Sequence, residues 1–247
     1  MENERFDEIL QYLKENKSAT VETLSKLLYT SEATVRRDLK KMHAAGLIER
    51  VHGGAYLDEK AGELSHILRS KKNESGKREV AKLAVDVLPS FNTLFIDSST
   101  TCLYLIEKLN LGLKTVVTNS ILSAEVLSKI ENCNTILLSG AVDGHTGSVI
   151  GSLTVRQLDD FCFDLAICSC AAISDGYTFE RTVDVGEVKK KALSNSRNKI
   201  LLVDGEKFSA VGTYRGFPLE FFDCVVTDVK PPKEYENGEI KFVYPEK

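Results

Sequence analysis

Long hydrophobic runs are scarce in this sequence. The longest, such as residues 102–106 and 200–203, are only as long as a strand, whereas a membrane span needs roughly 18 apolar residues. The first eight residues mix Glu, Arg and Asp without the apolar stretch of a secretory signal. We therefore expect no transmembrane helix, no contact with a membrane and a place in the cytoplasm.

Cysteine and net positive charge are also scarce. Six cysteines in 247 residues are too few for a disulfide scaffold and are expected to be mostly buried thiols. Cys168 and Cys170 form a C-x-C pair, but no histidine or second pair stands nearby at zinc-ligand spacing. The sequence predicts no metal site and no cofactor. The net charge of −4 means that any contact with nucleic acid must come from a local patch.

Three helices are predicted in the first 45 residues. An apolar stripe at i, i+3, i+4 and i+7 marks the first, from about residue 4 to 15. Thr20 can cap a second, short helix, and Ser31 can cap a third that runs from Glu32 to Ala45, where Gly46 ends it. The three-residue turn between the second and third helices is typical of a helix-turn-helix.

The third helix has one apolar and one cationic face. At about 100° per residue, Val35, Leu39 and Met42 cluster together and must face the core. The opposite face carries alanines, which would let the backbone approach a duplex, and cations, which can bond guanine edges or neutralise phosphates. Its members are Ala33, Arg37, Lys40 and Ala44, flanked by Arg36 and Lys41. The alternative is an ordinary solvated face.

A β-hairpin is predicted after the third helix. Residues 47–52 and 55–57 form its strands, with Gly53 and Gly54 in the turn. Between Ser31 and Gly54, five Lys and Arg stand against three acids, which is a local excess of positive charge in an acidic protein. The hairpin would be the wing of a winged helix, and this favours DNA binding.

Residues 31–55, SEATVRRDLKKMHAAGLIERVHGGA, resemble the winged helix-turn-helix of DeoR-type bacterial transcriptional regulators, above all in VRRDL and RVHGGA. The resemblance implies a double-stranded DNA operator as partner. In or beside the major groove it places Ser31, Thr34, Arg36, Arg37 and Lys40, and Lys41 joins them from the cationic face. Near the backbone or minor groove it places Arg50 and His52.

A second domain begins beyond a polar segment, residues 58–76. We expect a winged helix-turn-helix domain over residues 1–60, a linker over 61–76 and a sensing domain over 77–247. Strands alternate with helices in the last of these, which predicts an α/β fold with a mainly parallel sheet, after a small α+β domain. The expected strands are residues 93–96, 115–118, 135–138, 165–170, 199–203 and 224–227.

Polar residues follow four of these strands, where ligands of parallel sheets bind. The first strand runs into Asp97, Ser98, Ser99, Thr100 and Thr101 just before a helix, which suits a phosphate, although the hydroxyls could simply cap the helix. The other strand ends carry Asn119 and Ser120, then Ser139 and Gly140, then Asp204 and Lys207. The glycines of residues 140–151 are consistent with a loop near a ligand or with surface turns.

Five segments together resemble the sugar-phosphate sensor domain of DeoR-type regulators: IDSSTT, VVTNS, the SG with its following glycines, EVK and LVDGEKF. That sensor is similar in fold to ribose-5-phosphate isomerases. The resemblance implies a phosphate cradle at residues 98–101, with the sugar between Asn119, Asp175, Glu187, Lys189, Asp204 and Lys207. By the residues alone, Glu187 and Lys189 could equally be an ordinary solvated pair.

Two departures from the family pattern bear on the ligand. Ser99 stands where the family usually has glycine, and Glu206 where it commonly has serine. Serine lacks the freedom of glycine at positive φ, and a carboxylate repels phosphate. Affinity for the ligand or its identity is therefore expected to differ.

The leading hypothesis is a repressor of a carbohydrate operon, with DNA affinity set by a phosphorylated sugar. A homodimer or homotetramer is expected, because one short recognition helix reads few bases. The first alternative is a sugar-phosphate isomerase, with Asp97, Glu187 or Asp204 as general base and Lys189 or Lys207 stabilising an enediolate. A second is an architectural DNA-binding protein whose other domain is inert.

Overall fold

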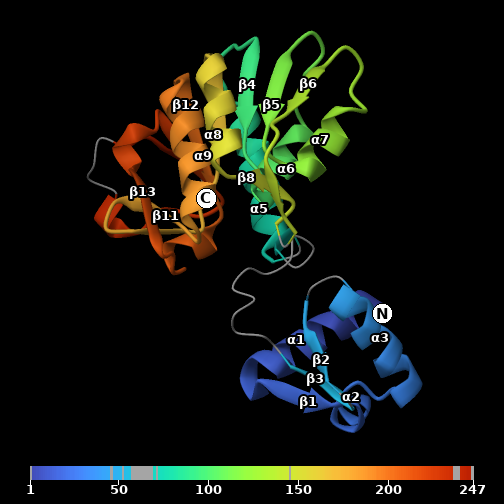
Figure 1. Ribbon diagram of the computed structural model, residues 1–247. Helices are drawn as coiled ribbons and strands as arrows, with labels where there is room; N and C mark the ends of the chain where they lie inside the picture. Colours follow the sequence, from blue (N-terminus) through green and yellow to red (C-terminus); the bar gives the residue numbers. More distant parts are fainter. Residues whose placement is uncertain are drawn as a thin grey trace. The chain divides into compact units, whose positions relative to one another are not determined.

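The computed structural model describes residues 2–44, 47–51, 53–56, 69–70, 72–144, 146–235 and 240–245. It divides into two compact units, Met1–Arg69 and Ser70–Lys247, which we call the N-terminal unit and the C-terminal unit (Figure 1). Within the described residues, no helix combines the length and the apolar character that crossing a membrane requires.

The N-terminal unit packs helices against a small antiparallel sheet of order β1-β3-β2. Its elements are α1 (Glu2–Asn16), β1 (Ser18–Thr20), α2 (Val21–Leu27), α3 (Glu32–Ala44), β2 (Glu49–Val51) and β3 (Gly54–Tyr56). The predicted helix-turn-helix and hairpin are confirmed. β1 was not predicted, because a strand of three residues is too short to show a period.

Local hydrogen bonds explain where two of these helices begin. The Oγ1 of Thr20 accepts a bond of 3.1 Å from the N–H of Thr23, and the Oγ of Ser31 accepts one of 3.2 Å from the N–H of Thr34. Both predicted caps are therefore confirmed. The predicted helix end at Ala45 and Gly46 lies outside the described residues.

A buried ion pair joins α1 to α3. Asp38 is 0% exposed, and its Oδ2 accepts a bond of 2.8 Å from the Nε of Arg5. Its Oδ1 has no partner among the described residues. The carboxylate is thus a charge inside the apolar cluster of the unit, where Arg5 compensates it.

The C-terminal unit is built on a seven-stranded sheet of order β15-β14-β12-β9-β4-β5-β6, with every neighbouring pair parallel. The strands are β4 (Thr93–Ile96), β5 (Thr115–Thr118), β6 (Asn134–Leu137), β9 (Phe163–Cys168), β12 (Ser196–Val203), β14 (Cys224–Thr227) and β15 (Phe242–Val243). The predicted α/β fold and its six strands are confirmed.

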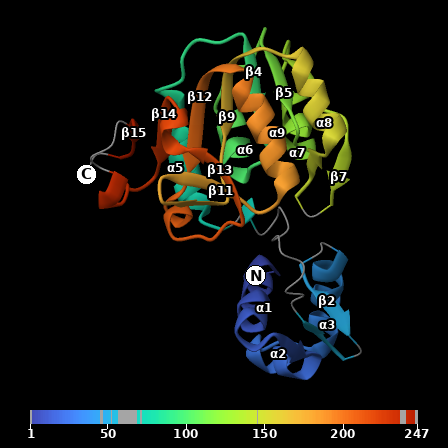
Figure 2. The same ribbon diagram turned by 60° about the vertical axis from the view of Figure 1, so that its left-hand side comes forward.

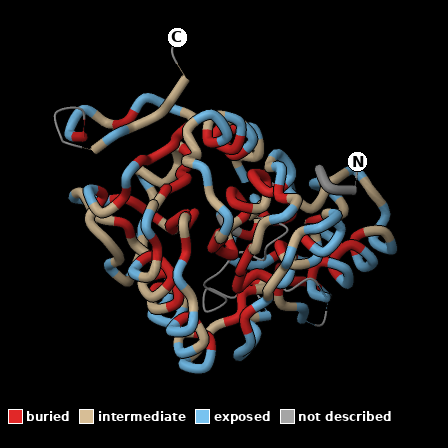
Figure 3. Tube along the Cα trace, turned by 90° about the horizontal axis from the view of Figure 1, so that it is seen from above, coloured by how far each residue is buried: buried red, intermediate tan, exposed pale blue. Residues whose placement is uncertain are grey.

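Helices cover both faces of this sheet (Figure 2). They are α5 (Glu74–Val85), α6 (Thr100–Ile106), α7 (Ile121–Leu127), α8 (Ser152–Gln157) and α9 (Val183–Ser194), with 3-10 turns η1 (Leu158–Asp160), η2 (Gly205–Phe208), η3 (Leu219–Phe221) and η4 (Lys233–Tyr235). Successive residues of β4 feed opposite cores: Leu94 and Ile96 pack with α5 and α6, whereas Phe95 packs with α9. Figure 3 shows the resulting buried interior.

Two smaller sheets were not predicted. β7 (Ala141–Asp143) and β8 (Ser148–Ile150) form an antiparallel hairpin where the glycine-rich segment was expected to be a loop. β10 (Ala172–Ser174), β11 (Tyr177–Glu180) and β13 (Tyr214–Pro218) form an antiparallel sheet. These strands are short, and the pairing of β11 with β13 joins residues far apart in sequence, so local periodicity could not reveal them.

The ion pair in the N-terminal unit gives a stability prediction. Arg5→Met should lower the free energy of unfolding of this unit by about 2–4 kcal/mol, because it leaves the buried Asp38 carboxylate uncompensated. Urea unfolding followed by circular dichroism measures the change. Lys26→Met, which removes an exposed pair with Glu22, is the control and should cost less than about 1 kcal/mol. Equal stability of Arg5→Met and the wild type would contradict the prediction.

Candidate functional site

The recognition face predicted on α3 is exposed. Val35, Leu39 and Met42 are buried, as their spacing predicted. The residues on the other side are all exposed: Ala33, Arg36, Arg37, Lys40, Lys41 and Ala44. The helix therefore presents small and cationic side chains to solvent over its whole length.

Partners within α3 divide these cations into two groups. Arg36 forms an ion pair of 2.9 Å with Glu32 one turn earlier, whereas Arg37 and Lys40 make no ion pair with any described residue. Ser31 and Thr34, expected near the groove, hold each other at 3.0 Å between their hydroxyls. Asp38 does not weaken the positive face, because it is buried against Arg5. Arg37 and Lys40 are the cations best placed to meet DNA.

The wing is the β2–β3 hairpin. Arg50 on β2 is exposed and pairs with Ala55 on β3. A Cβ on Gly54 would lie 2.2 Å from the carbonyl oxygen of Ala19, so only glycine lets β3 approach β1. His52, the other candidate of the wing, lies outside the described residues.

In the C-terminal unit, buried polar residues gather after the strands. Asp97 follows β4, Asn119 follows β5 and Asp204 follows β12, and each is at most 3% exposed. Parallel strands end at the same edge of a sheet, so the topology places these side chains at one edge. Ser98, Thr100, Thr101 and Ser120 are buried with them.

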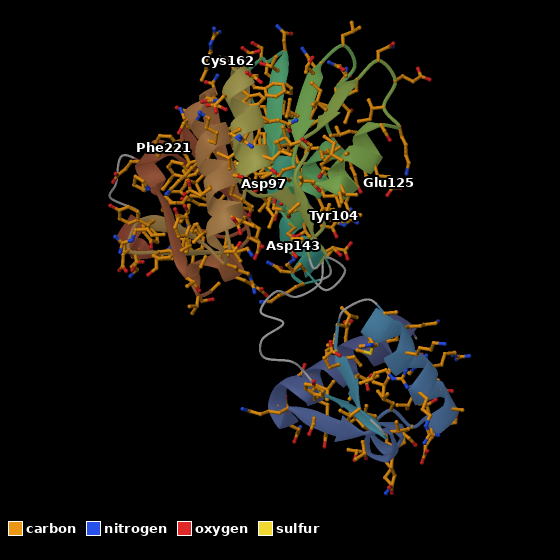
Figure 4. The ribbon with its side chains drawn as sticks, viewed as in Figure 1. Asp97, Tyr104, Glu125, Asp143, Cys162 and Phe221 are labelled. Carbon is orange, nitrogen blue, oxygen red and sulfur yellow. The ribbon has the colours of Figure 1, made fainter. Side chains whose placement is uncertain are left out.

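An ion cluster underlies this edge. The ammonium of Lys189 donates to Glu180 at 2.7 Å and to the carbonyl oxygen of Ser169 at 2.8 Å, and lies 3.2 Å from the Oδ2 of Asp97. Asp97, which is labelled in Figure 4, also accepts from the N–H groups of Ser99 and Ser169. Because an ammonium has three donors, Lys189 has none left for a ligand.

Burial and charge oppose each other in this cluster. Burial alone would raise the pKa of Asp97, but Lys189 and the N–H of Ser169 outweigh it and hold that pKa below its usual value. Burial raises the pKa of Glu180 in spite of Lys189. Burial alone would lower the pKa of Lys189, but Glu180 and Asp97 outweigh it and raise that pKa. The ammonium is therefore charged at every physiological pH.

The serine and threonine cluster after β4 has mixed roles. The Oγ of Ser99 accepts a bond of 3.1 Å from the N–H of Cys102, so this residue is the helix cap that the alternative interpretation expected. Its φ is −74°, so the position does not need glycine. The Oγ of Ser98 accepts a bond of 2.7 Å from Ser148 of β8. Thr100 and Thr101 open α6.

The β7–β8 hairpin lies against the strand ends. Asn119 donates from its Nδ2 to the carbonyl oxygen of Val149 at 3.2 Å, and Ser120 pairs with Ser148 as a β-bridge. The Oδ1 of Asn119 is buried without a partner among the described residues. Gly140 leads into the hairpin. A Cβ added to Gly140 would lie 2.1 Å from the Oγ1 of Thr154.

Asp204 caps the 3-10 turn η2, and Lys207 lies on that turn. The Oδ1 of Asp204 accepts from the N–H of Glu206 at 3.2 Å and from the Nδ2 of Asn73 at 3.3 Å. Burial raises the pKa of Cys170 to about 12, and the ammonium groups of Lys189 and Lys207 oppose this rise. Glu206, the departure from the family pattern, is neutralised by Lys72 at 2.8 Å.

Two expected site residues are not among these buried groups. Asp175 is exposed, with φ 49°, in the turn between β10 and β11. Glu187 accepts from the hydroxyl of Tyr214 at 2.6 Å and from Lys190 at 3.2 Å. Residues two apart on a helix point about 200° apart, so Glu187 and Lys189 form neither a shared contact nor a solvated pair.

The sequence missed several residues of this edge. Glu180, Ser148 and Asn73 contact Lys189, Ser98 and Asp204 respectively. Lys77, 4% exposed, donates to the carbonyl oxygen of Lys72. Each depends on a contact distant in sequence or on the unpredicted strands; only Lys77 carries a local signal, as a cation inside an apolar helical stripe.

Both units match known protein families. Residues 5–61 match the family described as DeoR-like helix-turn-helix domain, and residues 72–229 match the DeoR C terminal sensor domain. The HTH-type transcriptional repressor GlcR of Bacillus subtilis is 31% identical over 95% of this chain and 91% of its own length. The glycerol-3-phosphate regulon repressor of Escherichia coli is 29% identical over 94% and 92%.

Solved structures show weaker likenesses. Ribose 5-phosphate isomerase A from Methanocaldococcus jannaschii is 16% identical, with a TM-score of 0.39 over 55% of each chain. The sorbitol operon regulator SorC from Klebsiella pneumoniae is 12% identical, with a TM-score of 0.33 over 83% of this chain and 90% of that one.

Lys189→Met should destabilise the C-terminal unit in a pH-dependent way. Without the ammonium, the buried Asp97 and Glu180 carboxylates are expected to have pKa values above those in the unfolded chain, so stability is present at low pH and lost as pH rises. We expect a loss of about 3–5 kcal/mol at pH 7.5 and a smaller loss at pH 5, measured by urea unfolding.

The double variant Lys189→Met with Glu180→Gln is the matched test of the cause. It removes one of the two uncompensated carboxylates, so it should regain stability at pH 7.5 and depend less on pH. A loss in Lys189→Met that is the same at both pH values would show that packing, not charge, accounts for it.

Proposed function

We propose, from the premise that this chain belongs to the DeoR family of transcriptional regulators, that it represses a carbohydrate operon and that a phosphorylated sugar controls its affinity for DNA. Its relatives include repressors named for lactose phosphotransferase and glycerol-3-phosphate systems. The phosphate and the sugar in these names are the chemistry that we carry to this chain.

The DNA contact is proposed for α3 and the wing. Arg37 and Lys40 are exposed and make no ion pair with a described residue, and the buried stripe opposite them fixes the face they present. A cationic helix with small side chains between the cations suits the major groove. Arg50, on the exposed strand of the hairpin, suits the backbone or minor groove.

The ligand site is proposed at the carboxyl edge of the parallel sheet. The observation that carries it is the unpartnered Oδ1 of Asn119, buried among polar groups that follow β4, β5 and β12 of the same sheet. A buried acceptor without a partner is costly, and a sugar hydroxyl would satisfy it. We assign the phosphate to Ser98, Thr100 and Thr101, and the sugar to Asn119, Asp204 and Lys207.

Three other residues that the sequence predicted for the ligand site have a supporting role in this proposal. Asp97, Ser99 and Lys189 position the edge rather than touch the ligand, because the protein already uses their polar atoms. Asp175 and Glu187 stand outside it, and Gly140 and Ser120 shape the hairpin side.

We propose that the chain is not an enzyme. Two of the groups that an isomerase could use are engaged by the protein: Asp97 accepts two backbone N–H groups, and Lys189 has no free donor. Incubation with pentose phosphates should give no isomerised product. We also propose that the protein acts as a homodimer or homotetramer, since one recognition helix reads few bases. We propose the cytoplasm as its location.

Arg37→Ala and Lys40→Ala should each weaken binding to an operator that the wild-type protein selects from random-sequence DNA. Removal of a side chain with a direct base contact should weaken the binding free energy by about 1–3 kcal/mol. Removal of one that touches phosphate should reduce the slope of log K against log salt concentration by about one. Gel-shift titrations at several salt concentrations distinguish the two. Lys82→Ala, an exposed cation on α5, is the control. Wild-type affinity in both variants would remove the assigned face.

A sugar phosphate should raise the melting temperature of the wild-type protein, and the matching free sugar should not. The probes are glycerol 3-phosphate, glucose 6-phosphate, fructose 6-phosphate, galactose 6-phosphate and ribose 5-phosphate. At a hundred times the dissociation constant, binding stabilises by about 2.7 kcal/mol. Asn119→Leu and the double variant Thr100→Val with Thr101→Val should lose the shift.

Thr115→Val, at the opposite end of β5, is the control for these variants and should keep the shift. If no sugar phosphate shifts the wild-type melting temperature, the assigned ligand class is wrong. If the double threonine variant responds like the wild type, the phosphate does not bind where α6 begins.

A further inference from the structure

The first residues of the C-terminal unit are bonded to the elements that carry the proposed ligand site. We call Ser70, Lys72 and Asn73 the entry residues, because the N-terminal unit ends at Arg69. The chain that leads from the DNA-binding domain therefore reaches the sensor domain at these residues.

Each entry residue contacts a different residue on α6 or at η2. The carbonyl oxygen of Ser70 accepts a bond of 3.2 Å from the hydroxyl of Tyr104, which lies on α6 (Figure 4). Lys72 pairs with Glu206 of η2 at 2.8 Å. Asn73 donates to Asp204, at the start of η2, at 3.3 Å. α6 and η2 are also the elements that present Thr100, Thr101 and Lys207.

The backbone at this point has little freedom to rearrange independently. Asn73 has φ 48° and ψ 46°, in the left-handed region that asparagine tolerates better than most residues. A Cβ on Gly76 would lie 2.3 Å from Asp228 and 2.5 Å from the side chain of Asn73. Asp228 in turn accepts from the N–H of Gly205 at 2.7 Å. The entry residues and η2 are therefore packed as one piece.

A ligand at the sheet edge would act on these contacts directly. The Oδ1 of Asp204 is shared between Asn73 and the N–H of Glu206, so a sugar hydroxyl that engages this oxygen competes with Asn73. The negative charge that a phosphate brings to this edge repels the Glu206 carboxylate and attracts the Lys72 ammonium that now pairs with it. Either effect changes the contacts of the entry residues.

We infer that the entry residues are the coupling element of this regulator: ligand at the sheet edge resets their contacts with Tyr104, Asp204 and Glu206, and this changes the affinity of the preceding domain for DNA. The inference rests on the proposed function. By thermodynamic linkage, DNA must then change the affinity for the ligand by the same factor, and both factors must depend on the entry contacts.

The test uses three mild variants of the full-length protein. Tyr104→Phe removes only the hydroxyl, Glu206→Gln removes only the charge, and Asn73→Gly removes the amide at a backbone position that glycine adopts freely. Tyr214→Phe and Glu125→Gln are the matched controls. The first removes a hydroxyl that bonds Glu187, and the second removes an exposed ion pair between Glu125 of α7 and Lys129.

Three dissociation constants are measured for each protein. The first is that of the panel member with the largest melting shift, by calorimetry without DNA. The second and third are those of the selected operator, with and without this sugar phosphate. We expect the entry variants to bind the sugar phosphate no more than about threefold more weakly than the wild type, and the ratio of the larger to the smaller operator constant to fall at least about threefold. The variant with all three changes should bring the ratio close to one.

The outcomes separate this inference from the proposed function. Reduced coupling with intact ligand binding in the entry variants, and unchanged coupling in both controls, supports it. Wild-type coupling in all three entry variants overturns it and leaves the proposed function standing. If none of the five phosphates of the panel binds the wild type, the proposed function fails and this inference fails with it. An equal loss of coupling in the controls also overturns it.

Discussion

One buried ammonium group holds the carboxyl edge of the sheet together. Lys189 on α9 reaches the carboxylate that follows β4, the carbonyl oxygen that follows β9 and the Glu180 carboxylate of β11. The same Asp97 accepts the N–H of Ser99 and so fixes the turn into α6. Because the charges are buried, each depends on the others for compensation, and the shape of this edge follows from the cluster.

The cluster also decides which polar groups remain for a ligand. The ionisable side chains, Asp97 and Lys189, have their hydrogen-bonding capacity filled by the protein. The neutral amide of Asn119 keeps an acceptor with no partner among the described residues. A rigid edge built from satisfied charges with an unsatisfied amide beside it suits recognition of a neutral, hydroxylated ligand part rather than proton transfer.

The DNA-binding unit uses charge in the same two ways. Asp38 and Arg37 are neighbours in the sequence, yet the first is buried against α1 and the second faces solvent. The inward carboxylate ties α3 to α1, and this holds the outward cations on a fixed face. In both units a buried ion pair sets the geometry and exposed or unpartnered groups are left to bind.

The sequence by itself determined the elements whose signals are local. The caps at Thr20 and Ser31, the buried stripe of α3 and the six apolar strands followed from hydrogen-bonding capacity and periodicity, because each needs only near neighbours. Tertiary structure alone decided the partners of Asp97, Glu180 and Lys189. Their contacts join separate elements of the chain. Glu180 lies on β11, a short strand whose pairing with β13 no local pattern reveals.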